Sequence, residues 1–102
     1  MARRRKDRPD EQVSVCGREV SITYQRDLDD CDGCFYPDEA EIHVDLEASR
    51  DPDQILFHEL LHAALAFSGV SDLLTESSEE ALVSCLEQNI FPLVRLKARE
   101  KV

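Results

Sequence analysis

The chain has 102 residues, of which 42% are hydrophobic and 33% are charged, and its formal net charge is −10. This length suits a single domain with a modest core, and no apolar run approaches the ~20 residues that a membrane-spanning helix needs. The acidic balance argues against tight binding of duplex DNA by the folded part of the chain.

The N-terminus departs from this acidic balance. Residues 1–8 hold five basic side chains and one acidic one, so residues 9–102 carry a net charge of −14. No apolar segment follows the basic residues, so we do not expect a secretory signal, and a cytoplasmic location is the default expectation. We expect residues 1–10 to form a flexible basic arm, the one part of the chain suited to touch nucleic acid. No membrane partner is expected.

An alternating pattern after the arm predicts a β-hairpin. Apolar residues recur at every second position in residues 13–15 and again in residues 20–24, and Gly17-Arg18 between them can turn the chain. This period of two is typical of strands that place one face on a core.

A second hairpin is predicted further along, after a segment without periodicity. Residues 26–34 are rich in aspartate and predict a loop. Residues 35–36 and 40–44 then predict a strand, a turn and a strand, with alternate residues facing the core. We expect His43 on the opposite face, where a solvent-side histidine is a simpler interpretation than a ligand.

The segment Asp51-Pro52-Asp53 has the features of a helix start. An aspartate before the first turn can cap it, proline suits the first turn, and an acidic residue there favours the positive end of the helix dipole. We predict a helix over about 52–68 that stops at Gly69.

A second helix is predicted from apolar residues that recur at helical spacing from Leu82 onwards. It should cover about 77–99. Ser77 with Glu80 has the spacing of a capping box at its start, and Pro92 should kink it near its end.

These elements combine into one fold class. We predict an α+β fold in a single domain over residues 11–102. A small antiparallel sheet of hairpins, with about 3–4 strands, should pack on the helix over 52–68 and on the C-terminal helix over 77–99.

The strongest functional signal is a His-Glu-x-x-His motif inside the apolar run 55–67. His58 and His62 are four residues apart, so on a helix both imidazoles lie on one face and can reach one metal ion. Glu59 lies next to them, where a general base would act on a metal-bound water. The alternative is an ordinary core helix, but its three polar groups would then each need a buried partner. We therefore predict a zinc site with two histidine ligands and a catalytic glutamate.

A catalytic zinc needs a third protein ligand and one open position. The chain has three histidines and none follows His62, which excludes a downstream histidine and leaves a carboxylate from the next helix. Glu79 is in register with the apolar face of that helix, so we favour it as the third ligand, with Glu80 as the alternative. Both could instead be first-turn acids that favour the helix dipole.

Such a site predicts the hydrolysis of peptide-like amides. Zinc would lower the pKa of a bound water toward ~7, and Glu59 would take its proton as the water attacks a peptide carbonyl. The predicted function is a zinc-dependent metallopeptidase with a peptide or protein substrate. The alternative is a catalytically silent, zinc-stabilised regulatory or binding protein of the same fold.

Four cysteines add a second signal. In a cytosolic chain, cysteines are more often thiols or metal ligands than disulfides. Cys31 and Cys34 are spaced as in many zinc sites, and with Cys16 at the hairpin turn they could hold a second, structural zinc ion. A redox pair or plain loop thiols are the alternatives. Cys85 lies on the second helix, where we expect it to be a small buried apolar residue.

The motif also carries a resemblance to known proteins. The segment 57–64, the pair Ser68-Gly69 and the segment 79–83 resemble the small HExxH metallopeptidase-like proteins that are common in bacteriophage genomes. Those proteins are similar to minimal gluzincins and, more distantly, to ImmA-type and SprT-like proteases. The resemblance covers residues 40–92.

This resemblance implies two histidine ligands, a downstream glutamate ligand, the motif glutamate as base, and a small sheet beside the helix. The Asn-Glu or Glu-x-x-Ala-Asp context that usually surrounds the third ligand is missing, and the second subdomain of large gluzincins is missing too. It therefore implies narrow specificity, autoproteolysis or a cryptic activity rather than general proteolysis, in the host cytoplasm if the chain is phage-encoded. The implied roles carry onto His58, Glu59, His62 and Glu79 or Glu80.

Overall fold

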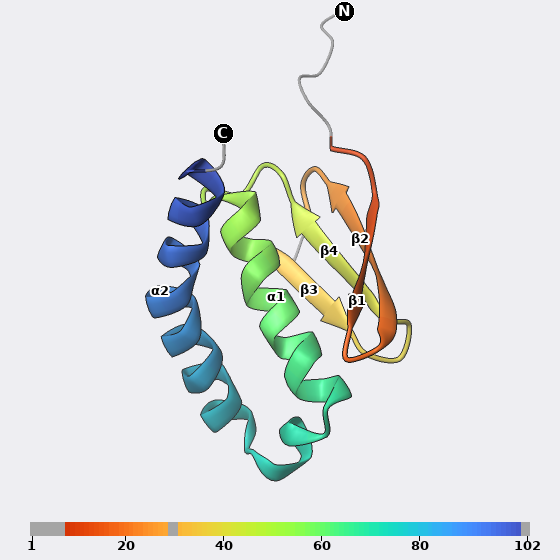
Figure 1. The fold of residues 1–102 in the computed structure, drawn as a ribbon. Coiled ribbons are helices and arrows are strands. Elements are labelled where there is room, and N and C mark those ends of the chain that lie inside the picture. Colours follow the sequence, from red (N-terminus) through yellow and green to blue (C-terminus); the bar gives the residue numbers. More distant parts are fainter. Residues whose placement is uncertain (1–7, 29–30, 101–102) are drawn as a thin grey trace, which may run out of the picture.

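The computed structural model describes residues 8–28 and 31–100, which form a four-stranded sheet and two long helices (Figure 1). The first helix lies against the sheet, and the second packs on the first. In chain order the elements are β1 (Glu11–Val15), β2 (Arg18–Gln25), β3 (Gly33–Tyr36), β4 (Glu41–Asp45), α1 (Pro52–Phe67), the short 3₁₀ helix η1 (Val70–Leu73) and α2 (Glu76–Glu100).

The sheet is mixed. Its strand order is β1-β2-β4-β3: β1 with β2 and β3 with β4 form the two predicted antiparallel hairpins, whereas β2 and β4 are parallel. The α+β class is therefore confirmed, but the prediction of an antiparallel sheet is wrong for its central pair. Alternation along a strand indicates which residues face the core, and it does not indicate which strands are neighbours.

The core lies between the sheet and α1. The parallel pairing sets Ile22 opposite Ile42, and both pack with Ile55 of α1 in a single cluster of buried side chains. Burying a side chain of this kind is worth roughly 1.5–3 kcal/mol. His43 lies on the other face of the sheet, as the alternation predicts, with its Nε2 atom 3.2 Å from Oε1 of Glu41.

α1 has the predicted start. The side chain of Asp51 accepts a hydrogen bond from the N–H of Asp53 at 3.0 Å, and Pro52 occupies the first turn. The helix ends at Phe67, and Gly69 follows with a φ of 88°, a conformation that favours glycine. The His-Glu-x-x-His motif thus lies in the middle of the helix, where helical geometry is best defined.

α2 begins one residue before the predicted start, and its cap differs from the predicted one. Oγ1 of Thr75 accepts a hydrogen bond from the N–H of Ser78 at 3.0 Å, so the expected capping box of Ser77 with Glu80 is wrong. Because Thr75 caps the helix, the Glu80 carboxylate is left to face α1. Pro92 lies inside the helix, which continues through it.

Most of the predicted basic arm, residues 1–7, lies outside the described residues. The described end of the arm is held on the fold: the Arg8 guanidinium is 2.8 Å from Oδ1 of Asp53, donates to the hydroxyl of Tyr24 at 3.0 Å and lies over that ring. No helix in the described part of the chain is long and apolar enough to cross a membrane.

Candidate metal centre

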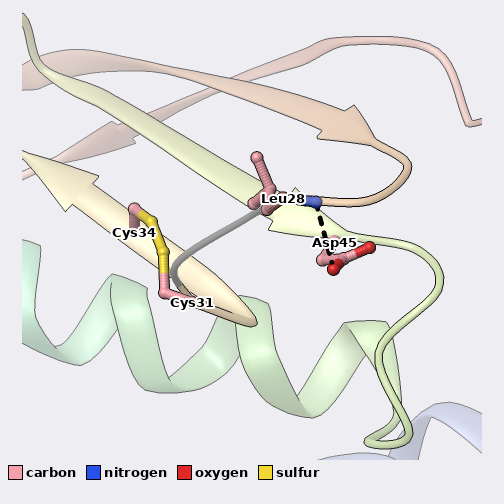
Figure 2. Close-up of a disulfide and its surroundings, with 4 residues drawn as sticks. All are labelled: Leu28, Cys31, Cys34 and Asp45. Carbon is pink, nitrogen blue, oxygen red and sulfur yellow. Dashed lines mark hydrogen bonds between the residues drawn. A yellow bond between two sulfur atoms is a disulfide. The ribbon is translucent and has the colours of Figure 1, made fainter.

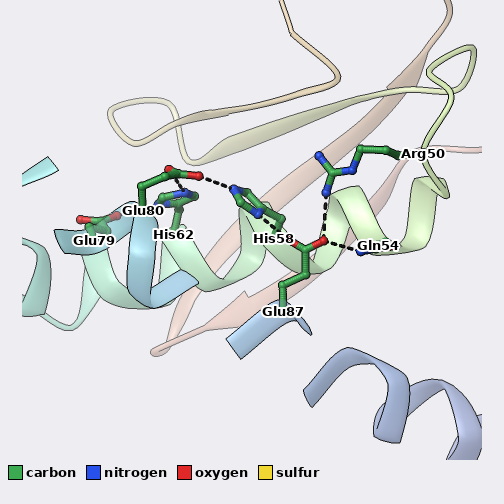
Figure 3. A network of polar contacts seen from close by, with 7 residues as sticks. All are labelled: Arg50, Gln54, His58, His62, Glu79, Glu80 and Glu87. Carbon is green, nitrogen blue, oxygen red and sulfur yellow. Dashed lines mark hydrogen bonds and ion pairs between the residues drawn. The ribbon is translucent and has the colours of Figure 1, made fainter. Parts of the chain in front are cut away.

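The His-Glu-x-x-His motif faces an open cleft. The cleft is bordered by β3, the middle of α1 and the first turns of α2. His58 and His62 lie on the same face of α1, with ring centroids 5.0 Å apart, and both side chains are mostly buried. Each imidazole turns its Nε2 atom toward a glutamate of α2 (Figure 3).

That glutamate is Glu80, which meets both Nε2 atoms. Its Oε2 is 3.0 Å from Nε2 of His58, and its Oε1 is 3.1 Å from Nε2 of His62. One ligand atom from each of these three residues lies within 4.8 Å of the other two, and no other three His, Cys, Asp or Glu residues in 8–28 and 31–100 meet this condition. The structure therefore brings the two predicted histidines together with the alternative third residue.

Glu79, the third ligand favoured from the sequence, lies on the other side of His62. Its Oε2 is 2.7 Å from Nδ1 of His62, so it contacts the ring nitrogen that faces away from Glu80. Adjacent residues on a helix point about 100° apart. The rotation of α2 against α1 decides which of the two glutamates faces both histidines, and the sequence pattern does not contain that rotation.

Glu87, one of the acidic residues that could have been a third ligand but was not favoured from the sequence, makes the matching contact with His58. Its Oε1 is 2.7 Å from Nδ1 of His58, and its Oε2 accepts hydrogen bonds from Arg50 at 3.0 Å and from Gln54. The residue is only 6% exposed. Glu80 and Glu87 are two helical turns apart and share one face of α2, which is the sequence signal that could have indicated this role.

The two glutamates at the Nδ1 atoms are held in the ionised form. Burial acts to raise the pKa of Glu87, but its hydrogen bonds with His58 and Gln54, together with the charge of Arg50, outweigh burial and lower that pKa. Burial likewise acts to raise the pKa of Glu79, but its hydrogen bonds with His62 and Ser71 and the charge of His62 together outweigh burial, so this pKa is lowered too. A carboxylate that accepts the Nδ1 proton fixes the imidazole tautomer and leaves the Nε2 lone pair free for a metal ion.

Glu59 lies beside this group and is largely buried. Burial raises its pKa, against the opposing influence of the two neighbouring imidazoles. Gly33, at the start of β3, lies on its other side: a Cβ atom added to Gly33 would be 3.2 Å from Cγ of Glu59 and 3.3 Å from its Oε2. A carboxylate with a raised pKa in such a position is suited to accept and return a proton.

The cluster is rich in negative charge. Glu59, Glu79, Glu80 and Glu87 all lie within reach of the two imidazoles, and Arg50 is paired with Glu87. Carboxylates gathered this closely repel one another unless a cation lies among them. Two imidazole nitrogens and a carboxylate oxygen form a donor set that zinc binds, so the residues fit a divalent metal ion.

The cysteines do not assemble the predicted second metal site. Cys31 and Cys34 are joined by a disulfide, which leaves neither sulfur as a thiolate ligand (Figure 2). Cys16 is an exposed thiol at the turn between β1 and β2, with its Sγ 3.7 Å from the carbonyl oxygen of Ala64. Cys85 is exposed on α2, so the expectation that it is buried is wrong.

Comparisons with protein-family models, with curated proteins and with solved structures found no match for this chain. The function of the site is therefore inferred from its geometry and from the chemistry of its residues.

Proposed function

We propose that the protein is a zinc-dependent metallopeptidase that hydrolyses peptide bonds. His58, His62 and Glu80 are its zinc ligands, and Glu59 is its general base. The observation that carries the proposal is the two-sided arrangement of both imidazoles: each Nε2 faces Glu80, and each Nδ1 is held by a carboxylate of its own. A helix that only buried two histidines would not need to aim both Nε2 atoms at one carboxylate.

Zinc, when bound, would act as a Lewis acid and lower the pKa of a coordinated water toward ~7. Glu59 accepts the proton of the attacking water and passes it to the leaving nitrogen. Its raised pKa suits a group that must both take up and release a proton. Glu79 and Glu87 hold the imidazoles by their Nδ1 atoms, so that both Nε2 lone pairs keep one direction.

The cleft favours an extended, peptide-like substrate. It is open to solvent and runs from β3 across α1 to the start of α2. Its lining combines apolar surface, such as Phe35 and Pro37, with the hydroxyls of Ser77 and Ser84. A polypeptide needs both kinds of surface, because its side chains and its backbone amides differ in polarity. Three protein ligands also leave one coordination position for water, as catalytic zinc sites require.

Metal content is the first test. Elemental analysis of the purified protein should find about one zinc ion per chain. Glu80→Ala should lose the zinc, whereas Glu59→Gln should keep it. Glu76→Ala is the matched control, because it removes the same charge from an exposed position in the first turn of the same helix. Zinc retained by Glu80→Ala at the wild-type level would overturn the assignment of this ligand.

Peptide cleavage is the second test. The zinc-loaded protein is incubated with a peptide library made from a bacterial proteome, and new termini are identified by mass spectrometry. The wild-type protein should cut at a restricted set of sites, and zinc-loaded Glu59→Gln should cut none. Cleavage by Glu59→Gln at the wild-type rate would contradict the mechanism. Zinc bound without any cleavage by the wild-type protein would instead favour a zinc-stabilised binding protein.

A further inference from the structure

The segment 31–34, a Cys-x-x-Cys sequence, has no role in the peptidase chemistry, yet it lies against the general base. Gly33 lies between the two bonded cysteines. It approaches α1 so closely that an added Cβ would collide with the side chain of Ile55 and press on Glu59. Cys34 lines the same cleft. Gly33 and Cys34 therefore form part of the wall of the cleft beside Glu59.

Asp45 of β4 anchors the chain on both sides of Cys31. Its buried carboxylate accepts a hydrogen bond from the N–H group of Asp27 at 3.0 Å. It also accepts one from the N–H group of Leu28 at 3.2 Å (Figure 2). Its own N–H donates to the carbonyl of Asp32 at 2.8 Å. Cys31 lies between these anchors, and the disulfide ties it to β3. Opening the disulfide would release Cys31 from β3 while the anchors on either side of it stay in place.

The disulfide is better suited to exchange than to stabilisation. Its cysteines are separated by only 3 positions, and a ring this short removes little entropy from the unfolded chain. His43 is the direct cross-strand partner of Cys34 between β4 and β3. Paired residues lie on one face of a sheet with Cβ atoms about 4.5–5.5 Å apart. An imidazole beside a sulfur stabilises the thiolate, which makes Cys34 the better leaving group.

We propose that Cys31 and Cys34 form a thiol–disulfide exchange site whose redox state sets the wall of the cleft beside Glu59. The thiolate of an external thiol reductant attacks Sγ of Cys31, and the S–S bond breaks to leave the Cys34 thiolate beside His43. The mixed disulfide now joins Cys31 to the first reductant molecule, and the thiol of a second reductant molecule attacks the sulfur of that first molecule. This step releases Cys31 and the oxidised reductant, so that two electrons and two protons have passed to the chain.

The exchange reaction itself is independent of the proposed peptidase function, and only its effect on catalysis rests on that function. In the oxidised chain, the ring includes Gly33 and adds to the strand pairing that holds it beside Glu59. In the reduced chain, Cys31 is released, and Gly33 is held there only by its pairing with Val44 and by the anchored Asp32. We therefore expect reduction to change the surroundings of Glu59 and to lower the rate of peptide cleavage.

A redox titration tests the exchange site. The full chain carries Cys16→Ser and Cys85→Ser to remove the other thiols, and it is equilibrated in buffers of reduced and oxidised glutathione. Alkylation and mass spectrometry should show a reversible transition between disulfide and dithiol. His43→Ala should require several-fold more reductant, whereas Thr23→Ala, beside His43 on β2, should not. A chain without a disulfide in oxidised glutathione, or an unchanged midpoint in His43→Ala, would overturn the proposal.

Amide NMR spectra of the metal-free chain test the coupling to the cleft. Resonances of Gly33, Ile55 and Glu59 should shift on reduction, while those of β1 should stay in place because β1 lies at the opposite edge of the sheet. The double variant Cys31→Ser, Cys34→Ser should show the reduced spectrum in either buffer. If this variant does not fold, the test rests on comparing the oxidised and reduced spectra of the chain that keeps Cys31 and Cys34. Unshifted Ile55 and Glu59 resonances would overturn the coupling, whether or not the protein cleaves any peptide.

Discussion

Oε1 of Glu87 contacts Nδ1 of His58, the ring nitrogen that faces away from Glu80. The other carboxylate oxygen of Glu87 pairs with Arg50. A carboxylate in this position changes metal affinity without contacting the metal, because it orients the ligand and raises its basicity. Glu87→Gln should therefore weaken zinc binding by about 10- to 100-fold. Competition with a chromophoric chelator measures this change.

Two further variants serve as comparisons for this prediction. Glu79→Gln should act in the same direction, because Glu79 holds Nδ1 of His62. Glu76→Gln should leave the affinity unchanged, since Glu76 is exposed and lies outside the cluster. Complete loss of zinc in Glu79→Gln, with zinc retained in Glu80→Ala, would exchange the roles of the two neighbouring glutamates.

Gly33 leads to a prediction about stability. Its φ is not positive, so its backbone conformation does not require glycine. Glycine is required because Ile55 and Glu59 approach too closely to leave room for a side chain. Gly33→Ala should lower the free energy of unfolding by about 1–3 kcal/mol through overpacking, measured by denaturant unfolding. Gly17→Ala is the contrasting variant. A Cβ there meets nothing within 4 Å, and only its φ of 77° carries a cost. An unaltered stability in Gly33→Ala would show that β3 can move away from α1.

Residue spacing was enough to single out His58, Glu59 and His62, because a helix converts a separation of four into a shared face. The third residue of the cluster depends on how α2 is rotated against α1. No local pattern encodes this rotation, and Glu79 and Glu80 are neighbours. A prediction that is wrong by one position therefore selects Glu79, which contacts Nδ1 of His62, in place of Glu80.

At the scale of elements, polar contacts join α1 and α2 beside apolar ones such as the ring pair of Phe57 and Phe91. Among the side chains described on α2, the buried ones are Val83 and Glu87. Near the ends of the pair, Asp51 at the start of α1 forms an ion pair with Arg95 of α2. Contacts of this kind stabilise the helix pair only while the carboxylates are ionised.

This dependence predicts acid sensitivity of the metal-free protein. Burial acts to raise the pKa values of Glu79, Glu87 and Asp51, but hydrogen bonds and nearby charges together outweigh burial and lower all three. Each of the three carboxylates has at least one of these partners on the other helix. Their stabilisation is complete above the ordinary pKa values of 4.5 for glutamate and 3.8 for aspartate. It is lost as the pH falls through the lowered values, so unfolding should need less denaturant at about pH 3 than at about pH 6.

The comparison is made in a chelator, so that metal release does not contribute. Glu87→Gln should reduce the difference in the free energy of unfolding between about pH 3 and about pH 6, because one of the three carboxyl groups is then gone. A free energy of unfolding that is equal at both pH values would contradict the prediction.

The elements were predictable because each buries one face. Both helices begin and end within one residue of the predicted positions. The strand order was not predictable, because β4 lies between β2 and β3 and its parallel contact with β2 joins distant segments of the chain. The prediction of the residue that caps α2 failed for a related reason. Thr75 and Ser77 both suit a helix start, and the sequence alone does not distinguish between them.

At the scale of the whole molecule, the chain is small and has a formal net charge of −10. A domain of this size has a limited core, so a dication that binds only the folded state should stabilise it measurably. Free zinc at ~100 times its Kd contributes about 2.7 kcal/mol. For a domain of this length, that corresponds to a Tm higher by roughly 10–20 °C.

Chelation should therefore lower the Tm of the zinc-loaded protein by roughly 10–20 °C, as measured by calorimetry. Glu80→Ala should unfold at one temperature with or without the chelator, because its zinc affinity is lost. An equal Tm for the wild-type protein in zinc and in chelator would contradict this prediction.

The parallel contact between β2 and β4 limits how quickly this chain can reach its native state. The two hairpins and the helix pair form between neighbouring segments, whereas Ile22 meets Ile42 only after a longer loop has closed. Loop closure costs entropy before any contact offsets it. We expect this contact in the folding transition state, so that Ile42→Val slows folding in stopped-flow kinetics, while substitutions on α2 mainly speed unfolding. α2, which supplies three of the cluster's glutamates, would then pack onto α1 late in folding and separate from it early in unfolding.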